Sequence, residues 1–139
     1  MAGSRTERPK PVAESPIGLF ALAQACEDAW NAATSSDPEC WSDKNRAHGQ
    51  CAVTALLVQD YFGGELLRAR VNEVSHYWNR LPSGEEVDLT RQQFASSIDV
   101  PPGEERERQY VLSFPDTARR YQELSDAVRA RLQPLDESR

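Results

Sequence analysis

The sequence predicts an α+β domain in which two helices precede a small antiparallel sheet and a third helix follows it. Apolar residues recur at helical spacing in three segments, and the period changes to alternation after Gly63-Gly64. The chain has 139 residues, enough for one hydrophobic core. We therefore expect a single domain over residues 16–133, with a mobile tail at 1–15 and a short tail at 134–139.

The first two helices are expected in the N-terminal half. Apolar residues spaced as in a helix extend from Ile17 to Ala33. A polar loop from Glu39 to Gly49 then leads into a second helix, from Gln50 to Phe62. Gly63-Gly64 ends this helix, because glycine readily takes the left-handed conformation at a helix C-terminus.

Three strands are expected next, from Glu65 to Val71, from Val74 to Leu81 and from Glu85 to Thr90. Pro82-Ser83-Gly84 is a turn signal between the last two. Since the strands follow one another closely, we expect an antiparallel sheet.

The rest of the chain returns to helical patterns. Residues 90–94 suit a short helical turn, and the segment at 100–108 is rich in proline and glutamate and expected to be exposed. The last helix is expected from Pro115 to Leu132, capped by Ser113 or Asp116. Its apolar stripe comprises Ala118, Tyr121, Leu124, Val128 and Leu132.

Charge and composition exclude several classes of function. The net charge of −6 disfavours nucleic acid and anionic membranes as partners, because both require surplus Lys and Arg. The chain has no apolar run long enough for a membrane span and no secretory signal. Three cysteines without an export signal favour reduced thiols, so we expect a cytoplasmic protein.

Gly49-Gln50-Cys51 places a thiol at the start of the second expected helix. The helix dipole and the free N–H groups of the first turn favour a thiolate there. Such a thiolate can serve as a nucleophile if a histidine and a carboxylate lie close by. The sequence offers both downstream, as His76 and Asp88.

The length of the hairpin loop decides whether these two side chains meet. If Pro82-Ser83-Gly84 is a three-residue loop, Leu81 faces Glu85, and His76 and Asp88 become diagonal neighbours on one face of the sheet. A two-residue loop would put them on opposite faces. With the longer loop, Cys51 would be the nucleophile, His76 the proton carrier and Asp88 the group that orients the imidazole.

Other residues complete the expected site. The backbone N–H of Cys51 would donate to an oxyanion, and the side-chain amide of Asn45 or Gln50 would be the second donor. Aromatic and polar side chains are expected to line the substrate pocket: Trp41, Tyr77, Trp78 and Asn79. Trp78 is also compatible with a place in the core.

Each of these residues has a structural alternative. A cysteine on an apolar helix usually fills the core, and we interpret Cys26 and Cys40 in this way. His48 is an alternative base, although no carboxylate is obviously placed to orient it. A zinc site built from the cysteines and histidines has no compact ligand spacing to support it, so we expect neither a metal nor another cofactor.

The ordered motifs also carry a family resemblance. Between roughly Trp30 and Phe94 the chain resembles the YunG family of small bacterial proteins, and the resemblance lies in three segments: Gly49-Gln50-Cys51-Ala52-Val53-Thr54-Ala55, Ser75-His76-Tyr77-Trp78-Asn79 and Glu86-Val87-Asp88-Leu89-Thr90.

More distantly, the chain is similar to transglutaminase-like and papain-like cysteine enzymes. Their Gly-Gln-Cys, His-x-Trp and Val-Asp elements correspond here to Cys51, His76 and Asp88. Asn45 stands where the papain-like pattern has the glutamine of its oxyanion hole. The resemblance implies a papain-like fold, but the superfamily includes proteases, amidases, acyltransferases and inactive members.

The sequence thus predicts a catalytic-type domain that hydrolyses or transfers an acyl group. Its substrate would be an amide, thioester or ester of a small molecule or peptide, through an acyl-enzyme on Cys51. A non-enzymatic binding or partner protein on the same fold is the alternative. The oligomeric state is left open by the sequence.

Overall fold

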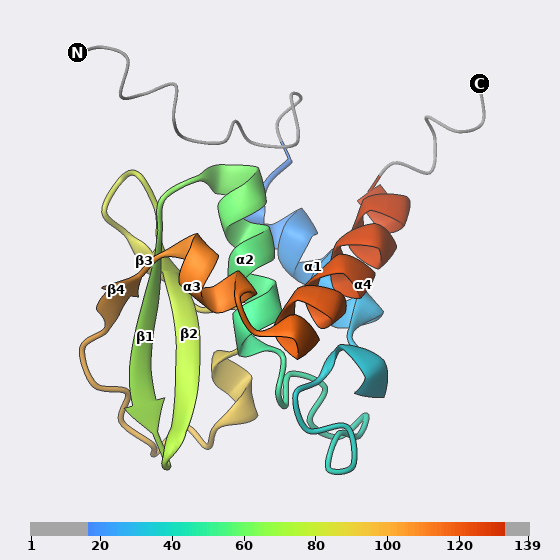
Figure 1. Cartoon of the computed structure of the whole chain (residues 1–139), viewed down its shortest axis with the longest axis horizontal. Coiled ribbons are helices and arrows are strands. Elements are labelled where there is room, and N and C mark those ends of the chain that lie inside the picture. The colour runs from blue at the N-terminus through green and yellow to red at the C-terminus, as the bar shows by residue number, and fades with distance from the viewer. Residues whose placement is uncertain (1–16, 133–139) are drawn as a thin grey trace.

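The computed structural model describes residues 17–132 (Figure 1). The expected tails at 1–15 and 134–139, and residues 16 and 133, lie outside the described residues. The elements in chain order are α1 Leu19–Ala29, η2 Ala32–Thr34, α2 Cys51–Phe62, β1 Glu65–Val71, β2 Val74–Arg80, β3 Glu86–Val87, η3 Arg91–Gln93, β4 Glu104–Arg106, α3 Arg108–Leu112 and α4 Pro115–Leu132.

The helix α2 lies between the sheet on one side and the pair α1 and α4 on the other (Figure 1). Its sequence explains this position, because every residue from Val53 to Val58 is buried and no face is left polar. On one side α2 packs against Trp30, whose indole N–H donates to Thr54 at 3.0 Å. On the other side Ala55 and Leu56 pack against β1 and β2. A central helix held on both sides keeps its first residue, Cys51, in a fixed position.

The sheet has four antiparallel strands in the order β3-β2-β1-β4. Asn79 pairs with Val87 and Arg80 with Glu86, and the backbone N–H of Leu81 donates to the carbonyl of Glu85 at 2.8 Å. This is the register of the three-residue loop, so that prediction is confirmed. The α+β class is confirmed by the same architecture.

The third strand is shorter than predicted. It ends at Val87 because the next residue, Asp88, turns its carboxylate back onto the backbone N–H of Thr90 at 3.1 Å. Such a turn competes with strand pairing for the backbone groups. The side chain of Asp88 therefore leaves the sheet edge and lies over β2.

The first helix also differs from the prediction, because it ends at Ala29. Asn31 starts a separate turn, η2. The Asn31 side chain accepts a hydrogen bond from the backbone N–H of Thr34, and the Thr34 hydroxyl accepts one from the backbone N–H of Asn31. This reciprocal capping stabilises a new helical start three residues beyond the helix.

The C-terminal part contains two elements that the sequence analysis missed. Strand β4 pairs with β1 at Leu66–Arg68, and α3 precedes α4. The predicted bounds of α4 are confirmed, but its predicted caps are wrong. The Ser113 hydroxyl donates to the carbonyl of Tyr110, and the Asp116 carboxylate binds Arg119 and Arg120. Among the helices described here, none is long and apolar enough to cross a membrane.

Candidate active site

The tripeptide Gly49-Gln50-Cys51 forms the entry to α2. Gly49 has φ of +74°, and a Cβ on it would lie 2.2 Å from Oγ of Ser35 and 2.9 Å from the backbone nitrogen of Ser36, so only glycine fits. The next side chain, Gln50, is fully buried. This entry fixes the backbone immediately before the thiol.

Cys51 is the first residue of α2, and its side chain is half-buried. Its Sγ lies 3.7 Å from the carbonyl oxygen of Ser75 on β2. No side chain caps this end of the helix. The amides of the first turn therefore have no intrahelical acceptor and no side-chain acceptor, which favours negative charge at this point.

His76 lies on β2, and its imidazole is fully buried. Nε2 is 2.6 Å from Oδ2 of Asp88. The ring stacks on Trp78 with 5.4 Å between the ring centroids, and Phe94 packs edge-on at 4.9 Å. The two aromatic side chains leave the ring little freedom to rotate.

The surroundings of His76 also set its charge. Burial by itself lowers the pKa of His76, but the hydrogen bonds and charges of Asp88 and Cys51 outweigh burial and raise the pKa to about 9. Nδ1 is buried and has no hydrogen-bond partner of normal geometry. Because Asp88 occupies Nε2, Nδ1 is the ring nitrogen left for the neighbouring Cys51 thiol. The imidazole thus lies between a thiol and a carboxylate, and both groups raise its pKa.

A hydrogen-bonded chain continues beyond Asp88. Its Oδ1 accepts from the hydroxyl of buried Thr90 at 3.3 Å, and that hydroxyl accepts from Nε2 of Gln93 at 3.1 Å. Oε1 of Gln93 in turn accepts from the backbone N–H of Gly49 at 3.4 Å. These hydrogen bonds thus connect the carboxylate of Asp88 to the loop that precedes Cys51.

Thr90, Gln93 and Phe94 belong to the site but were not predicted from the sequence. The Asp88-x-Thr90 spacing is a signal that could have been used, because aspartate often accepts from the residue two positions on. Gln93 and Phe94 reach the site only through the turn η3, which no local pattern connects to His76.

The two side chains predicted as oxyanion donors both make hydrogen bonds to backbone carbonyls. Nε2 of Gln50 donates to the carbonyl of Asn31 at 3.0 Å inside the core. Nδ2 of Asn45 donates to the carbonyl of Gln93 at 3.3 Å. These hydrogen bonds hold Gln50 in the core and join Asn45 to η3, and the second-donor role of either amide stays a prediction.

Two of the predicted pocket residues have structural roles as well. Nδ2 of buried Asn79 donates to the carbonyl of Ala55 at 2.9 Å, which joins β2 to α2. The indole N–H of Trp41 donates to the carbonyl of Arg46 at 2.8 Å, and the Arg46 guanidinium lies over its ring. Both side chains are held by these hydrogen bonds, and their place in a substrate pocket stays a prediction.

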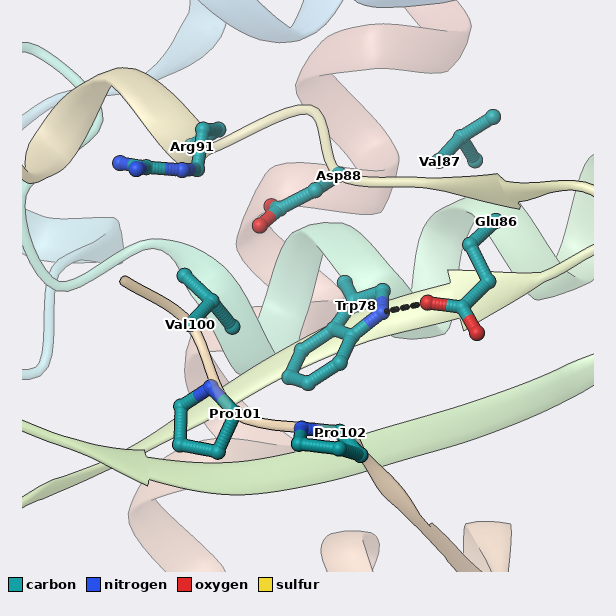
Figure 2. Close-up of a pocket in the computed structure, with 8 residues that line it drawn as sticks. All are labelled: Trp78, Glu86, Val87, Asp88, Arg91, Val100, Pro101 and Pro102. Atoms are coloured by element: carbon teal, nitrogen blue, oxygen red, sulfur yellow. Dashed lines mark hydrogen bonds between the residues drawn. The ribbon is translucent and has the colours of Figure 1, made fainter. Parts of the chain in front are cut away.

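Tyr77 and Trp78 point to opposite faces of the sheet. Tyr77 packs with Cys51 on the α2 side. Trp78 lines a pocket of about 360 Å³ on the other face, together with Glu86, Val87, Asp88, Arg91, Val100, Pro101 and Pro102 (Figure 2). In Figure 2 the Trp78 ring lies between Asp88 and the two prolines, and its N–H donates to Glu86 at 2.9 Å. This pocket reaches the carboxylate of the site but not Cys51.

A second cluster of the same residue types lies on the surface. Nε2 of His48 is 3.0 Å from Oδ2 of Asp37, so the expectation that no carboxylate orients His48 is wrong. Cys40 is exposed, so its interpretation as a core residue is wrong too. Asp37 raises the pKa of the Cys40 thiol through its hydrogen bond and charge, and His48 holds the pKa of Asp37 below its usual value.

The third cysteine is a core residue, as predicted. Cys26 is fully buried in α1, and burial raises the pKa of its thiol to about 12. Within residues 17–132 no group of three or more His, Cys, Asp and Glu side chains could hold a metal ion.

The fold and the site together define a class: a small α+β protein with a cysteine, a histidine and an aspartate gathered at the start of a central buried helix. Comparison with known proteins identifies the family. The model of the family described as YunG protein matches residues 19–133, and the chain belongs to this family. The uncharacterized protein YunG of Bacillus subtilis (strain 168) is 32% identical over 115 residues, which cover 80% of this chain and 91% of that protein. No solved structure matches the chain.

Proposed function

We propose that this protein is a thiol-dependent hydrolase or acyltransferase in which Cys51, His76 and Asp88 form a catalytic triad. One arrangement carries the proposal: His76 is fully buried, its Nε2 binds Asp88, its Nδ1 has no hydrogen-bond partner, and Cys51 is close enough to raise its pKa. A buried imidazole with a raised pKa and one unpaired nitrogen is suited to carry a proton.

The proposed reaction begins with attack of the Cys51 thiolate on the carbonyl carbon of an amide, thioester or ester. A C–S bond forms, and the carbonyl electrons move onto oxygen, where the unpaired amides of the first turn of α2 would stabilise them. The His76 cation donates its proton to the leaving group, which departs as the carbonyl re-forms. Asp88 stabilises the imidazolium before this step and orients the ring throughout.

The second half of the reaction releases the acyl group. Neutral His76 removes a proton from water or an amine, which attacks the thioester carbon. The C–S bond breaks, and Cys51 leaves as a thiolate beside the re-formed imidazolium. Water as acceptor gives hydrolysis, and an amine gives acyl transfer.

We also propose that the fold is related to those of transglutaminase-like and papain-like enzymes. The order of the three residues supports this relation, as does their placement at a helix start, on one strand and directly after the next. The substrate would be a small molecule or a peptide.

The proposal is tested by trapping the acyl-enzyme. The protein is incubated with an activated acetyl ester at pH 7, and the acetylated cysteine is located by peptide mass spectrometry. Acetyl on Cys51 in the wild type, and its loss in Cys51→Ser and His76→Ala, is the expected result. The exposed Cys40 is an internal control, and acetylation there at the rate of Cys51 would contradict the proposal.

A non-enzymatic binding protein is the second candidate, and the pocket at Trp78 favours it. That pocket is the cavity in Figure 2, which reaches Asp88 but not Cys51. This candidate predicts no acetylation of Cys51 beyond that of Cys40 in the same experiment.

A further inference from the structure

The Arg68 guanidinium and the Cys51 thiol both contact Ser75. Arg68 is half-buried on β1 and faces Tyr77 of β2 in the sheet register. Its Nε and Nη2 donate to Oγ of Ser75 at 3.0 and 2.7 Å. The carbonyl oxygen of the same Ser75 lies 3.7 Å from Sγ of Cys51. Ser75 therefore contacts the Arg68 guanidinium through its hydroxyl and the Cys51 thiol through its carbonyl oxygen.

In the part of the chain that the structure describes, Arg68 uses only one edge of its guanidinium group for hydrogen bonds to Ser75, and the other edge is free to bind an anion. Ser75 occupies the edge formed by Nε and Nη2. The edge formed by Nη1 and Nη2 is the one that binds a carboxylate through two parallel hydrogen bonds. Within the described residues no carboxylate lies within ion-pair distance of Arg68. The nearest in register, Glu104 on β4, binds Arg106 at 3.4 Å.

Arg68 and Cys51 both shift the pKa of the Tyr77 hydroxyl. Burial raises the pKa of Tyr77, the charge of Arg68 is the strongest influence that lowers it, and Cys51 raises it. Tyr77 belongs to the core cluster between α2 and the sheet against which Cys51 packs. Arg68 and Cys51 thus lie on the same side of the sheet, around one aromatic side chain.

We infer that Arg68 binds a carboxylate of the substrate, so that the acyl donor for Cys51 is a carboxylate-bearing acyl compound such as the half-amide or half-thioester of a dicarboxylic acid. This inference rests on the proposed function. An unpaired guanidinium is well suited to select a planar anion, because its geometry is fixed and its charge does not titrate. In a chain of net charge −6, such a local positive charge also steers an anion to the thiol.

The test compares two alkylating reagents that differ in charge. Iodoacetate carries the carboxylate, and iodoacetamide is its neutral counterpart. Both alkylate the Cys51 thiolate with loss of iodide, and the rates are measured by peptide mass spectrometry at pH 7 and low ionic strength. The quantity of interest is the ratio of the iodoacetate rate to the iodoacetamide rate at Cys51.

Arg68→Gln should lower this ratio by about threefold to fivefold, the size expected for a half-exposed ion pair. The matched control is Arg131→Gln, which removes the same charge from the last turn of α4. That end of α4 lies away from the start of α2 (Figure 1). The control should leave the ratio unchanged, and added salt should reduce the difference between the two variants.

The outcomes separate this inference from the proposed function. If iodoacetamide labels Cys51 rapidly but Arg68→Gln leaves the ratio at the wild-type value, the inference is overturned and the proposed function stands. If iodoacetamide labels Cys51 no faster than Cys40, the proposed function fails. Ser75→Ala is a second variant that keeps the charge but removes its anchor, and it should lower the ratio less than Arg68→Gln does.

Discussion

Within the described residues, a cysteine, a histidine and an aspartate lie together in two clusters. The clusters differ in which residue stands between the other two, and in how deeply they are buried. In the first, the histidine stands in the middle: His76 lies between Cys51 and Asp88 and is fully buried. In the second, the aspartate stands in the middle, and Asp37 interacts with both Cys40 and His48 at the surface.

The order of the residues decides what happens to each thiol. The residue beside the Cys51 thiol is a histidine, whereas the residue beside the Cys40 thiol is the Asp37 carboxylate, which raises the pKa of Cys40. The same three residue types thus surround the two thiols differently, and the proposed function predicts that Cys51 is the nucleophile and Cys40 is not. Residue types alone therefore do not define a site. The reactivity of each thiol depends on which group lies next to its sulfur.

The largest expected effect separates the two histidines. His76→Ala should slow hydrolysis of an activated ester by about 100-fold or more, because it removes the proton carrier. His48→Ala should leave the rate within about twofold of the wild type, since a surface substitution does not reach Cys51. The measurement is the initial rate at pH 7, and equal losses in the two variants would remove the distinction between the clusters.

The second prediction concerns stability against pH. The pKa of His76 is raised from 6.5 to about 9 in the folded protein, so the stability that its charge contributes is complete below pH 6.5 and is lost as pH rises through 9. The loss for this buried side chain is on the order of 3 kcal/mol.

Urea unfolding from pH 6 to pH 10 checks this prediction, with His76→Gln as the comparison. The wild type should lose more stability than the variant over this range. Parallel curves for the two proteins would show that His76 carries no raised pKa.

The third prediction is a pair of matched substitutions with opposite signs. Asp88→Asn should slow alkylation of Cys51 by iodoacetamide, because the cation at His76 loses its counterion. Asp37→Asn should speed alkylation of Cys40, because the charge that keeps this thiol protonated is gone. Both effects should be severalfold, and peptide mass spectrometry measures them in the same samples. If the two substitutions both slowed, or both sped up, alkylation of their cysteine, the proposed difference between the two clusters would be contradicted.

The smallest expected effect concerns the chain behind Asp88. Thr90→Val removes the buried hydroxyl that joins Asp88 to Gln93 and should cost about 1 kcal/mol of stability. It should also lower the pKa of His76, because Asp88 is then held less firmly. Thr90→Ser should restore both values, and an NMR titration of His76 distinguishes this positioning role from a purely structural one.

Local patterns were sufficient to predict the elements that carry the site. The apolar run of α2 specifies a buried helix. The turn at Pro82-Ser83-Gly84 specifies the hairpin register, which brings Asp88 to His76. These features depend on neighbours in sequence, which a pattern can represent.

Other features depend on contacts between distant segments. Strand β4 is a charged Glu104–Arg106 segment on an exposed sheet edge, and only its pairing with β1 makes it a strand. Gln50 looks like an available amide in the sequence, but it is buried against Asn31 through the loop at Gly49. The partner of His48 was missed for the same reason, because Asp37 is brought to it by a fold of the loop.

The most direct test of the central claim compares Cys51 and Cys40 in one molecule. Iodoacetamide is added to the wild-type protein at pH 7, and the alkylation rate of each cysteine is followed by peptide mass spectrometry. Accessibility alone would make the exposed Cys40 react first, since Cys51 is half-buried. The imidazolium of His76 predicts the reverse, with Cys51 reacting about tenfold faster or more. Faster alkylation of Cys40 would contradict the account.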